Sequence, residues 1–149
     1  MNIRRWVLYI LAGALLCGGA VQAGRYDDQP EAVTVQHILI GFKRSIPDKK
    51  VDRNKAEARE LANDLLERAK GMDQKEFTAL VEEYTDDSPP GIYILVNEGQ
   101  PLVRGARKRR DMVARFGDVA FELELGEVGI ANYHGGNCPY GWHIIMRLE

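Results

Sequence analysis

Two apolar segments near opposite ends of the chain each contain a single histidine. One covers residues 32–40 and includes His37, and the other covers residues 142–148 and includes His143. Short aliphatic runs of this kind are typical of buried strands. A buried imidazole needs partners for its ring nitrogens, because an unsatisfied buried polar group costs about 1–3 kcal/mol. Each histidine alone fits an ordinary core position, but the two imidazoles could be each other's partners if their strands are neighbours in one sheet.

Two amphipathic helices are predicted between the histidine segments. Residues 54–57 and 73–76 each match a capping box, the pattern that begins a helix. Gly71 supplies a stop for the first helix. Apolar residues follow each box at helical spacing. They are Ala58, Leu61, Ala62, Leu65, Leu66 and Ala69 in the first helix, and Phe77, Leu80, Val81 and Tyr84 in the second.

The second half of the chain predicts short strands and one more helix. A strand is expected at residues 92–96, a third helix from Asp111, and a further strand near residues 130–133. Residues 99–110 and 133–140 are typical of loops. The order β-α-α-β-α-β-β indicates an α+β domain with one antiparallel or mixed sheet. We expect the helices to cover one face of the sheet and the other face to be open for a ligand.

Several classes of chemistry have no support in the sequence. The three histidines and two cysteines do not have the spacing of a zinc site. There is no phosphate-binding loop, dinucleotide fingerprint or nucleophile elbow. The formal net charge of −2 does not indicate a general nucleic-acid binder. We therefore expect no metal and no cofactor.

The N-terminal residues match a secretory signal peptide. A basic start is followed by an apolar run over residues 6–16 and by small residues up to Ala23. We expect cleavage after Ala23, and therefore export to the periplasm or the extracellular space of a bacterial-type cell. The alternative of an uncleaved membrane anchor is disfavoured, since a span needs roughly 20 apolar residues. Lipidation of Cys17 is disfavoured by Leu16 before it.

The mature chain is expected to be a single domain. Residues 24–31 are polar and predict a short linker, followed by one domain over residues 32–149. Cys138 is the only cysteine left after cleavage, so no intramolecular disulfide is expected.

Four segments of the chain, in order, resemble those of one known family. Residues 36–40 and 140–145 resemble the two histidine strands that bracket parvulin domains. Residues 77–88 look like the second helix of that family with its following turn, and residues 112–127 are similar to its substrate-pocket helix. From residue 33 to residue 149, the chain thus resembles a parvulin-type, PpiC-like peptidyl-prolyl cis/trans isomerase, or rotamase.

The resemblance implies a fold and a set of site residues. The fold would be the parvulin (FKBP-like) fold, with a four-stranded, mainly antiparallel sheet and about three helices. One departure is residues 89–99, which replace a glycine-rich stretch of the family. The implied catalytic residues are His37, Asp87, His143 and Tyr140, and the implied substrate-binding residues are Met112, Phe116 and Leu39.

The implied activity is the isomerisation of X-Pro bonds in exported polypeptides. Rotation about the bond breaks amide resonance, a barrier of ~18–20 kcal/mol, and no covalent bond is made or cut. The expected partners are proline-containing polypeptides, with no nucleic acid. We expect a monomer that meets a membrane only transiently or through an uncleaved signal.

Two alternatives remain open at the level of sequence. A parvulin-like domain could hold unfolded chains without catalysing isomerisation, as the altered residues 89–99 suggest. An envelope-interaction protein could instead use the basic run 107–110 to contact acidic chains or lipid headgroups. We favour solvated positions for that run and for the four basic residues of the first loop, Lys43, Arg44, Lys49 and Lys50.

Overall fold

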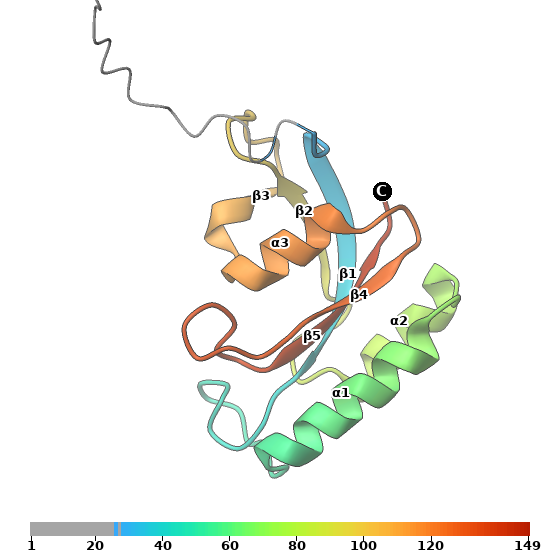
Figure 1. Ribbon diagram of the computed structural model, residues 1–149, viewed down its shortest axis with the longest axis vertical. Coiled ribbons are helices and arrows are strands. Elements are labelled where there is room, and N and C mark those ends of the chain that lie inside the picture. The colour runs from blue at the N-terminus through green and yellow to red at the C-terminus, as the bar shows by residue number, and fades with distance from the viewer. Residues whose placement is uncertain (1–25, 27) are drawn as a thin grey trace, which may run out of the picture.

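The computed structural model describes Tyr26 and residues 28–149, which form one sheet with helices on both faces (Figure 1). The predicted signal peptide, residues 1–23, lies outside the described residues. The sheet has the strand order β3-β2-β1-β5-β4. All neighbouring strands are antiparallel except β2 and β3. The strands are β1 (Ala32–Ile40), β2 (Ile92–Val96), β3 (Arg107–Lys108), β4 (Val128–Ala131) and β5 (Trp142–Arg147).

The expected α+β fold is confirmed, with one strand more than expected. The extra strand is β3, two residues long, inside the segment predicted as a loop. It pairs in parallel with Leu95 and Val96 of β2. A strand of two residues has no alternating pattern, so the sequence offered no sign of it. β4 begins two residues earlier than the predicted strand, at Val128 rather than Ile130.

The first and last strands of the sheet are direct neighbours at its centre. β1 pairs with β5, so that Leu39 faces His143 and His37 faces Ile145. Both strands are almost fully buried, because each has apolar side chains on both faces of the sheet. The two histidine strands are therefore neighbours, which was the condition for the two imidazoles to be each other's partners.

The helices α1 (Lys55–Ala69) and α2 (Gln74–Tyr84) cover one face of the sheet. Both begin at the predicted capping boxes, with the side chains of Asn54 and Asp73 accepting hydrogen bonds from backbone N–H groups of the first turn. Their core contains the side chains that β1 and β5 direct to this face, among them Ile38 and Ile144.

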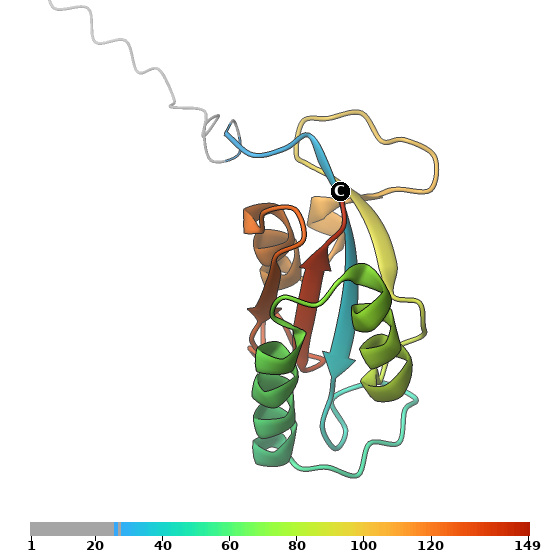
Figure 2. The ribbon, with the colours of Figure 1, turned by 90° about the vertical axis from the view of Figure 1, so that its right-hand side faces the viewer.

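The third helix lies on the opposite face, which corrects the expectation that all helices share one face. In Figure 2, α1 and α2 are on the near side of the sheet and α3 (Ala114–Glu122) is on the far side. The far face also has apolar side chains, such as Val35 and Ile145, and α3 covers them with Phe116 and Ala120. The helix starts at Ala114 rather than Asp111, because a 3-10 turn over Arg109–Asp111 precedes it. None of the described helices is long and apolar enough to cross a bilayer.

The described part of the segment before β1, which was predicted as a short linker, contacts the domain. Asn97 donates its side-chain amide to the Pro30 carbonyl at 3.0 Å. Arg109 contacts Gln29 and lies 4.3 Å from the centre of the Tyr26 ring.

The expected solvated position of the basic run is wrong for Arg109. Its side chain is 6% exposed and pairs with Asp118 at 2.8 Å.

Candidate active site

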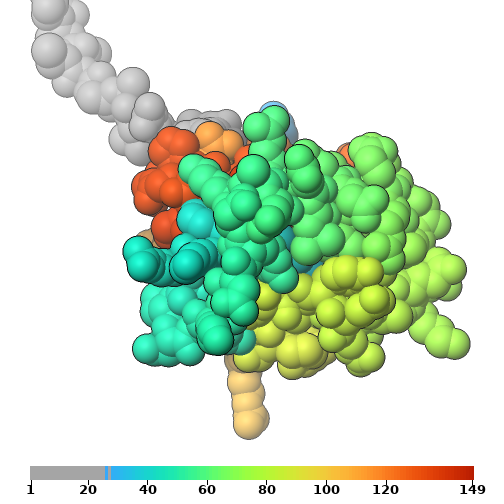
Figure 3. Space-filling view, turned by 90° about the horizontal axis from the view of Figure 1, so that it is seen from below, coloured from blue at the N-terminus to red at the C-terminus, as the bar shows by residue number. Residues whose placement is uncertain are grey.

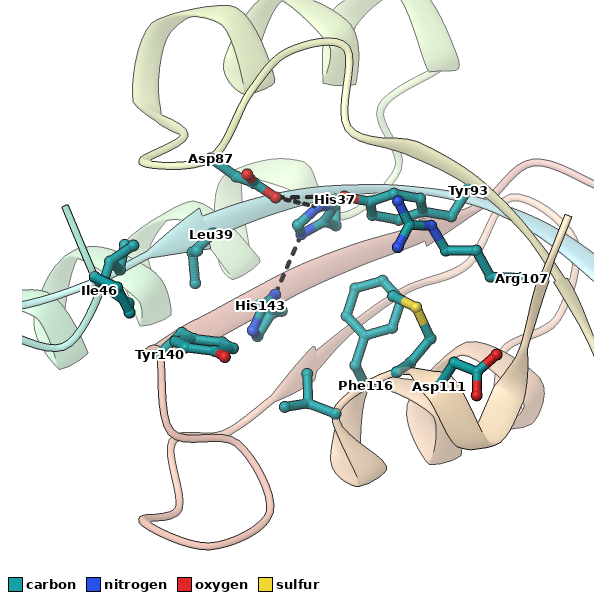
Figure 4. A pocket seen from close by; sticks show the side chains of 13 residues that line it. His37, Leu39, Ile46, Asp87, Tyr93, Arg107, Asp111, Phe116, Tyr140 and His143 are labelled. Carbon is teal, nitrogen blue, oxygen red and sulfur yellow. Dashed lines mark hydrogen bonds and ion pairs between the residues drawn. The ribbon is translucent and has the colours of Figure 1, made fainter. Parts of the chain in front are cut away.

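A hollow of about 520 Å³ lies on the α3 side of the sheet (Figure 4). Its floor is formed by β1 and β5, and its walls come from the first loop, the segment after α2, β2 and the start of α3. All seven site residues expected from the resemblance line it. The lining residues are His37, Leu39, Ile46, Pro47, Asp87, Tyr93, Arg107, Asp111, Met112, Val113, Phe116, Tyr140 and His143.

The two imidazoles contact each other at the floor of the pocket. The Nδ1 atoms of His37 and His143 are 3.2 Å apart, and the ring planes are nearly parallel, at 26°. Both side chains are almost completely buried, with 2% and 4% exposure. Because a contact between two ring nitrogens needs one donor and one acceptor, one Nδ1 is protonated and the other is not.

Asp87 interacts with the outer side of the His37 ring. Its Oδ2 atom lies 3.4 Å from His37 Nε2, and it accepts a hydrogen bond from the Tyr93 hydroxyl, also at 3.4 Å. The interaction with His37 is the main cause that lowers the pKa of Asp87 to about 2, against the opposite effect of burial. Asp87 is therefore an anion at neutral pH.

The state of His143 follows from its surroundings. Burial lowers the pKa of His143 strongly, and the electrostatic interaction with the neighbouring His37 ring acts in the same direction. A neutral His143 and an anionic Asp87 are compatible with His37 directing Nε2–H toward Asp87, and either His37 or His143 can then be the donor of the Nδ1–Nδ1 contact. Neither His37 Nε2 nor His143 Nε2 has a hydrogen-bond partner among the described residues, so the 3.4 Å approach of Asp87 to His37 is a longer polar contact rather than a hydrogen bond.

The segment that precedes Asp87 is fixed to the end of β1. Thr85 Oγ1 accepts hydrogen bonds from the backbone N–H groups of Leu39 and Asp87, at 3.0 and 3.2 Å. Asp86 accepts from Gly41 N–H at 2.8 Å and pairs with Arg53. The first loop and the segment after α2 thus lie side by side, as Figure 3 shows at the lower end of the molecule. These contacts decide where the Asp87 carboxylate lies.

Gly91 allows the backbone to pass close to His37. It has φ of +64°, a conformation that favours glycine, and a Cβ at this position would lie 2.7 Å from the His37 carbonyl oxygen. His37 N–H donates to the Gly91 carbonyl at 3.0 Å. The fully buried Gln36 donates its amide to Pro90 O at 2.9 Å. The altered segment at residues 89–91 is therefore tightly fitted to β1, and it leads into β2 as predicted.

The apolar part of the pocket is built around Phe116. Its ring meets the rings of His37 and His143 edge to face, at 5.1 and 5.3 Å between centroids. Met112 lies beside it at the approach to α3. Tyr140 is different, because it is 40% exposed at the rim and takes no part in the polar contacts that link Asp87, His37 and His143.

Six lining residues were missed by reasoning from the sequence: Ile46, Pro47, Tyr93, Arg107, Asp111 and Val113. Tyr93 and Arg107 are the two of them that contact each other beside the imidazoles. The Tyr93 ring lies 5.3 Å from the His37 ring and 6.2 Å from that of Phe116. The guanidinium of Arg107 lies 5.1 Å above the Tyr93 ring. Tyr93 stands in a strand that was predicted, but only the pairing Val35↔Tyr93 shows that it shares a face with His37. The sequence shows that Tyr93 and Leu95 lie on the same face of their strand. Only the register between β1 and β2 shows that this is also the face of His37.

The sequence matches the family model described as the PPIC-type PPIASE domain over residues 21–149, which includes every residue of the pocket. A search among curated proteins gave no significant match.

Proposed function

The chain belongs to the PPIC-type family of peptidyl-prolyl cis/trans isomerases, and from this premise we propose that its substrates are X-Pro bonds in exported unfolded or folding polypeptides. The apolar run near the N-terminus, with small residues up to Ala23, supports export to a periplasm or the extracellular space. N-terminal sequencing of the secreted or periplasmic protein tests this part. A first residue other than Gly24, or retention of the protein in the cytoplasm, would contradict it.

In the proposed mechanism the amide rotates without any covalent intermediate. The proline ring rests on Phe116 and Met112, where the apolar surface excludes water. A twisted amide has lost conjugation and is less polar than the planar form, so a dry site favours it. Catalysis requires that the site bind this twisted form better than either planar ground state.

The polar groups beside the apolar surface would hold the substrate as the bond turns. Asp87, as an anion, repels the carbonyl oxygen and directs it away from itself, which favours one direction of rotation. The pair His37–His143 fixes the hydrogen-bond pattern around Asp87 and does not act as a nucleophile. Tyr140 lies at the rim, where its phenol can donate to the substrate backbone.

One observation carries this proposal: the Phe116 ring contacts both imidazoles, so the apolar surface and the polar chain form a single site. The test is an isomerase assay of the full chain on a proline tetrapeptide, with Asp87→Ala and His143→Ala as variants. We expect both variants to be slower than the wild type. Unchanged turnover in both would remove these residues from the mechanism.

A second candidate function is the holding of unfolded chains. It is favoured by exposed apolar side chains outside the pocket, on β2 and on the loop after it: Ile92, Ile94, Leu102 and Val103. Refolding of a protein limited by proline isomerisation separates the two functions. An isomerase speeds that refolding in catalytic amounts, whereas a holding chaperone only suppresses aggregation when present in stoichiometric amounts.

A further inference from the structure

Two of the four cations in the basic run Arg107–Arg110, Arg107 and Lys108, have no carboxylate partner among the described residues, and of these two Arg107 lines the pocket. Two members of the run are paired, as Arg109–Asp118 at 2.8 Å and Arg110–Glu98 at 3.8 Å. Among Tyr26 and residues 28–149, no carboxylate oxygen lies within 4 Å of the Arg107 guanidinium. Arg107 is thus the cation of this run that a ligand can reach from the pocket.

The strand pairing directs Arg107 to the face that carries the site. β3 pairs with β2 so that Arg107 is the partner of Leu95, whose side chain belongs to the core on the α3 side. The guanidinium lies 5.1 Å above the Tyr93 ring, which holds it at the pocket wall (Figure 4). A cation over an aromatic face is attracted by the ring's electrons, so the side chain is partly ordered before any substrate arrives.

We propose that Arg107 determines specificity by favouring substrates with a carboxylate side chain next to the proline. This inference rests on the proposed function. A proline ring on Phe116 and Met112 leaves its flanking residues at the pocket edge, where Arg107 lies. A guanidinium is planar, always charged and able to bind a carboxylate through two parallel hydrogen bonds, which suits Asp or Glu in a peptide.

Other charges at the pocket bear on the size of the effect. Asp87 repels an acidic side chain, but it lies at the Tyr93 hydroxyl, whereas Arg107 lies over the Tyr93 ring. Asp111 is exposed on the same edge and opposes the attraction. Lys49 is a second cation, whose charge reaches Asp87. The preference is therefore expected to be moderate, about fivefold in kcat/KM, which is the range of an exposed ion pair.

The test uses the full chain and tetrapeptides that carry Glu, Gln or Lys directly before or directly after the proline. We expect the wild type to prefer Glu over Gln about fivefold at one of the two positions, and to disfavour Lys there. Arg107→Gln should bring the Glu/Gln ratio to about one. Asp111→Asn should raise the ratio, since it removes the opposing charge.

Arg104→Gln is the matched control, because Arg104 is exposed in the same loop but does not line the pocket. It should keep the wild-type ratio. Equal rates with Glu and Gln in the wild type, or a preference that persists in Arg107→Gln but disappears in Lys49→Gln, would overturn the proposal while leaving the isomerase function intact. If no peptide of the set is isomerised, the proposed function itself has failed, and this inference fails with it.

Discussion

The Nδ1 atoms of His37 and His143 lie 3.2 Å apart, although the two residues are separated by 106 positions in the sequence. The contact exists because β1 and β5 are neighbours and because both imidazoles point to the same face of the sheet. Asp87 extends the interaction on one side, and Phe116 covers both rings. The two imidazoles are therefore buried and joined through Nδ1, while the Nε2 atom of each has no hydrogen-bond partner among the described residues.

Removal of one imidazole should affect stability and activity together. His143→Ala leaves His37 Nδ1 buried without its partner, which should lower the free energy of unfolding by about 1–3 kcal/mol. It should also lower kcat/KM on a proline tetrapeptide. Urea denaturation and the isomerase assay measure the two effects. His134→Ala is the control, since His134 is exposed in the loop before β5 and its ring accepts hydrogen bonds only from the N–H groups of Gly136 and Asn137 in that loop, so the change should cost less stability and leave activity unchanged. A variant at 143 as stable and as active as the control would contradict the assigned contact.

The ionisation of Asp87 should make the folded state less stable in acid. Its pKa is about 2 when folded, below the ordinary value of 3.8, so the unfolded chain binds the proton more readily. The contribution of Asp87 is complete above pH 4 and is lost as the pH falls from about 4 to about 2. Thermal unfolding of the wild type and Asp87→Asn between pH 2 and pH 5 should show a smaller loss of Tm in the variant. Parallel curves would mean that Asp87 has an ordinary pKa.

The close approach of Gly91 to His37 should make this position sensitive to a methyl group. Gly91→Ala strains a backbone at φ of +64° and places Cβ 2.7 Å from the His37 carbonyl oxygen. Gly99→Ala is matched, because Gly99 also has positive φ, at +81°, but a Cβ there meets nothing within 4 Å. We expect both variants to lose stability, by about 1 kcal/mol from the backbone strain, and Gly91→Ala to lose more. Only Gly91→Ala should reduce isomerase activity. Equal effects in the two variants would show that the contact with His37 has no consequence.

Phe116 should matter for substrate binding beyond its part in the core. Phe116→Leu keeps an apolar side chain but removes the edge-to-face contacts with both imidazoles. It also reduces the apolar area that a proline ring can contact. We expect a higher KM and a modest loss of stability, of about 1 kcal/mol. Phe77→Leu makes the same substitution at a fully buried position of α2, on the other face of the sheet. It should lose comparable stability with an unchanged KM, and a rise of KM in both variants would point to a general loss of order.

The features of the fold that could be predicted are those that depend on residues close together in the sequence. The capping boxes at Asn54 and Asp73 begin α1 and α2 as expected, because each box joins groups three residues apart. The strands at residues 32–40 and 92–96 have the predicted bounds, since their apolar composition alone distinguishes them. The site residues implied by family resemblance all line one pocket, since the family match covers the whole domain.

The sequence by itself thus determined where most helices and strands form, and which family's residues to look for. Only the tertiary structure decided that Tyr93 and Arg107 join the site, that Arg109 is buried while Arg107 is not, and that α3 crosses to the other face. The physical reason is that strand pairing is a long-range choice, and a slip of one residue would send every side chain of a strand to the opposite face. The sequence of residues 92–110 does not by itself predict this register, because the register depends on which strands form backbone hydrogen bonds with one another.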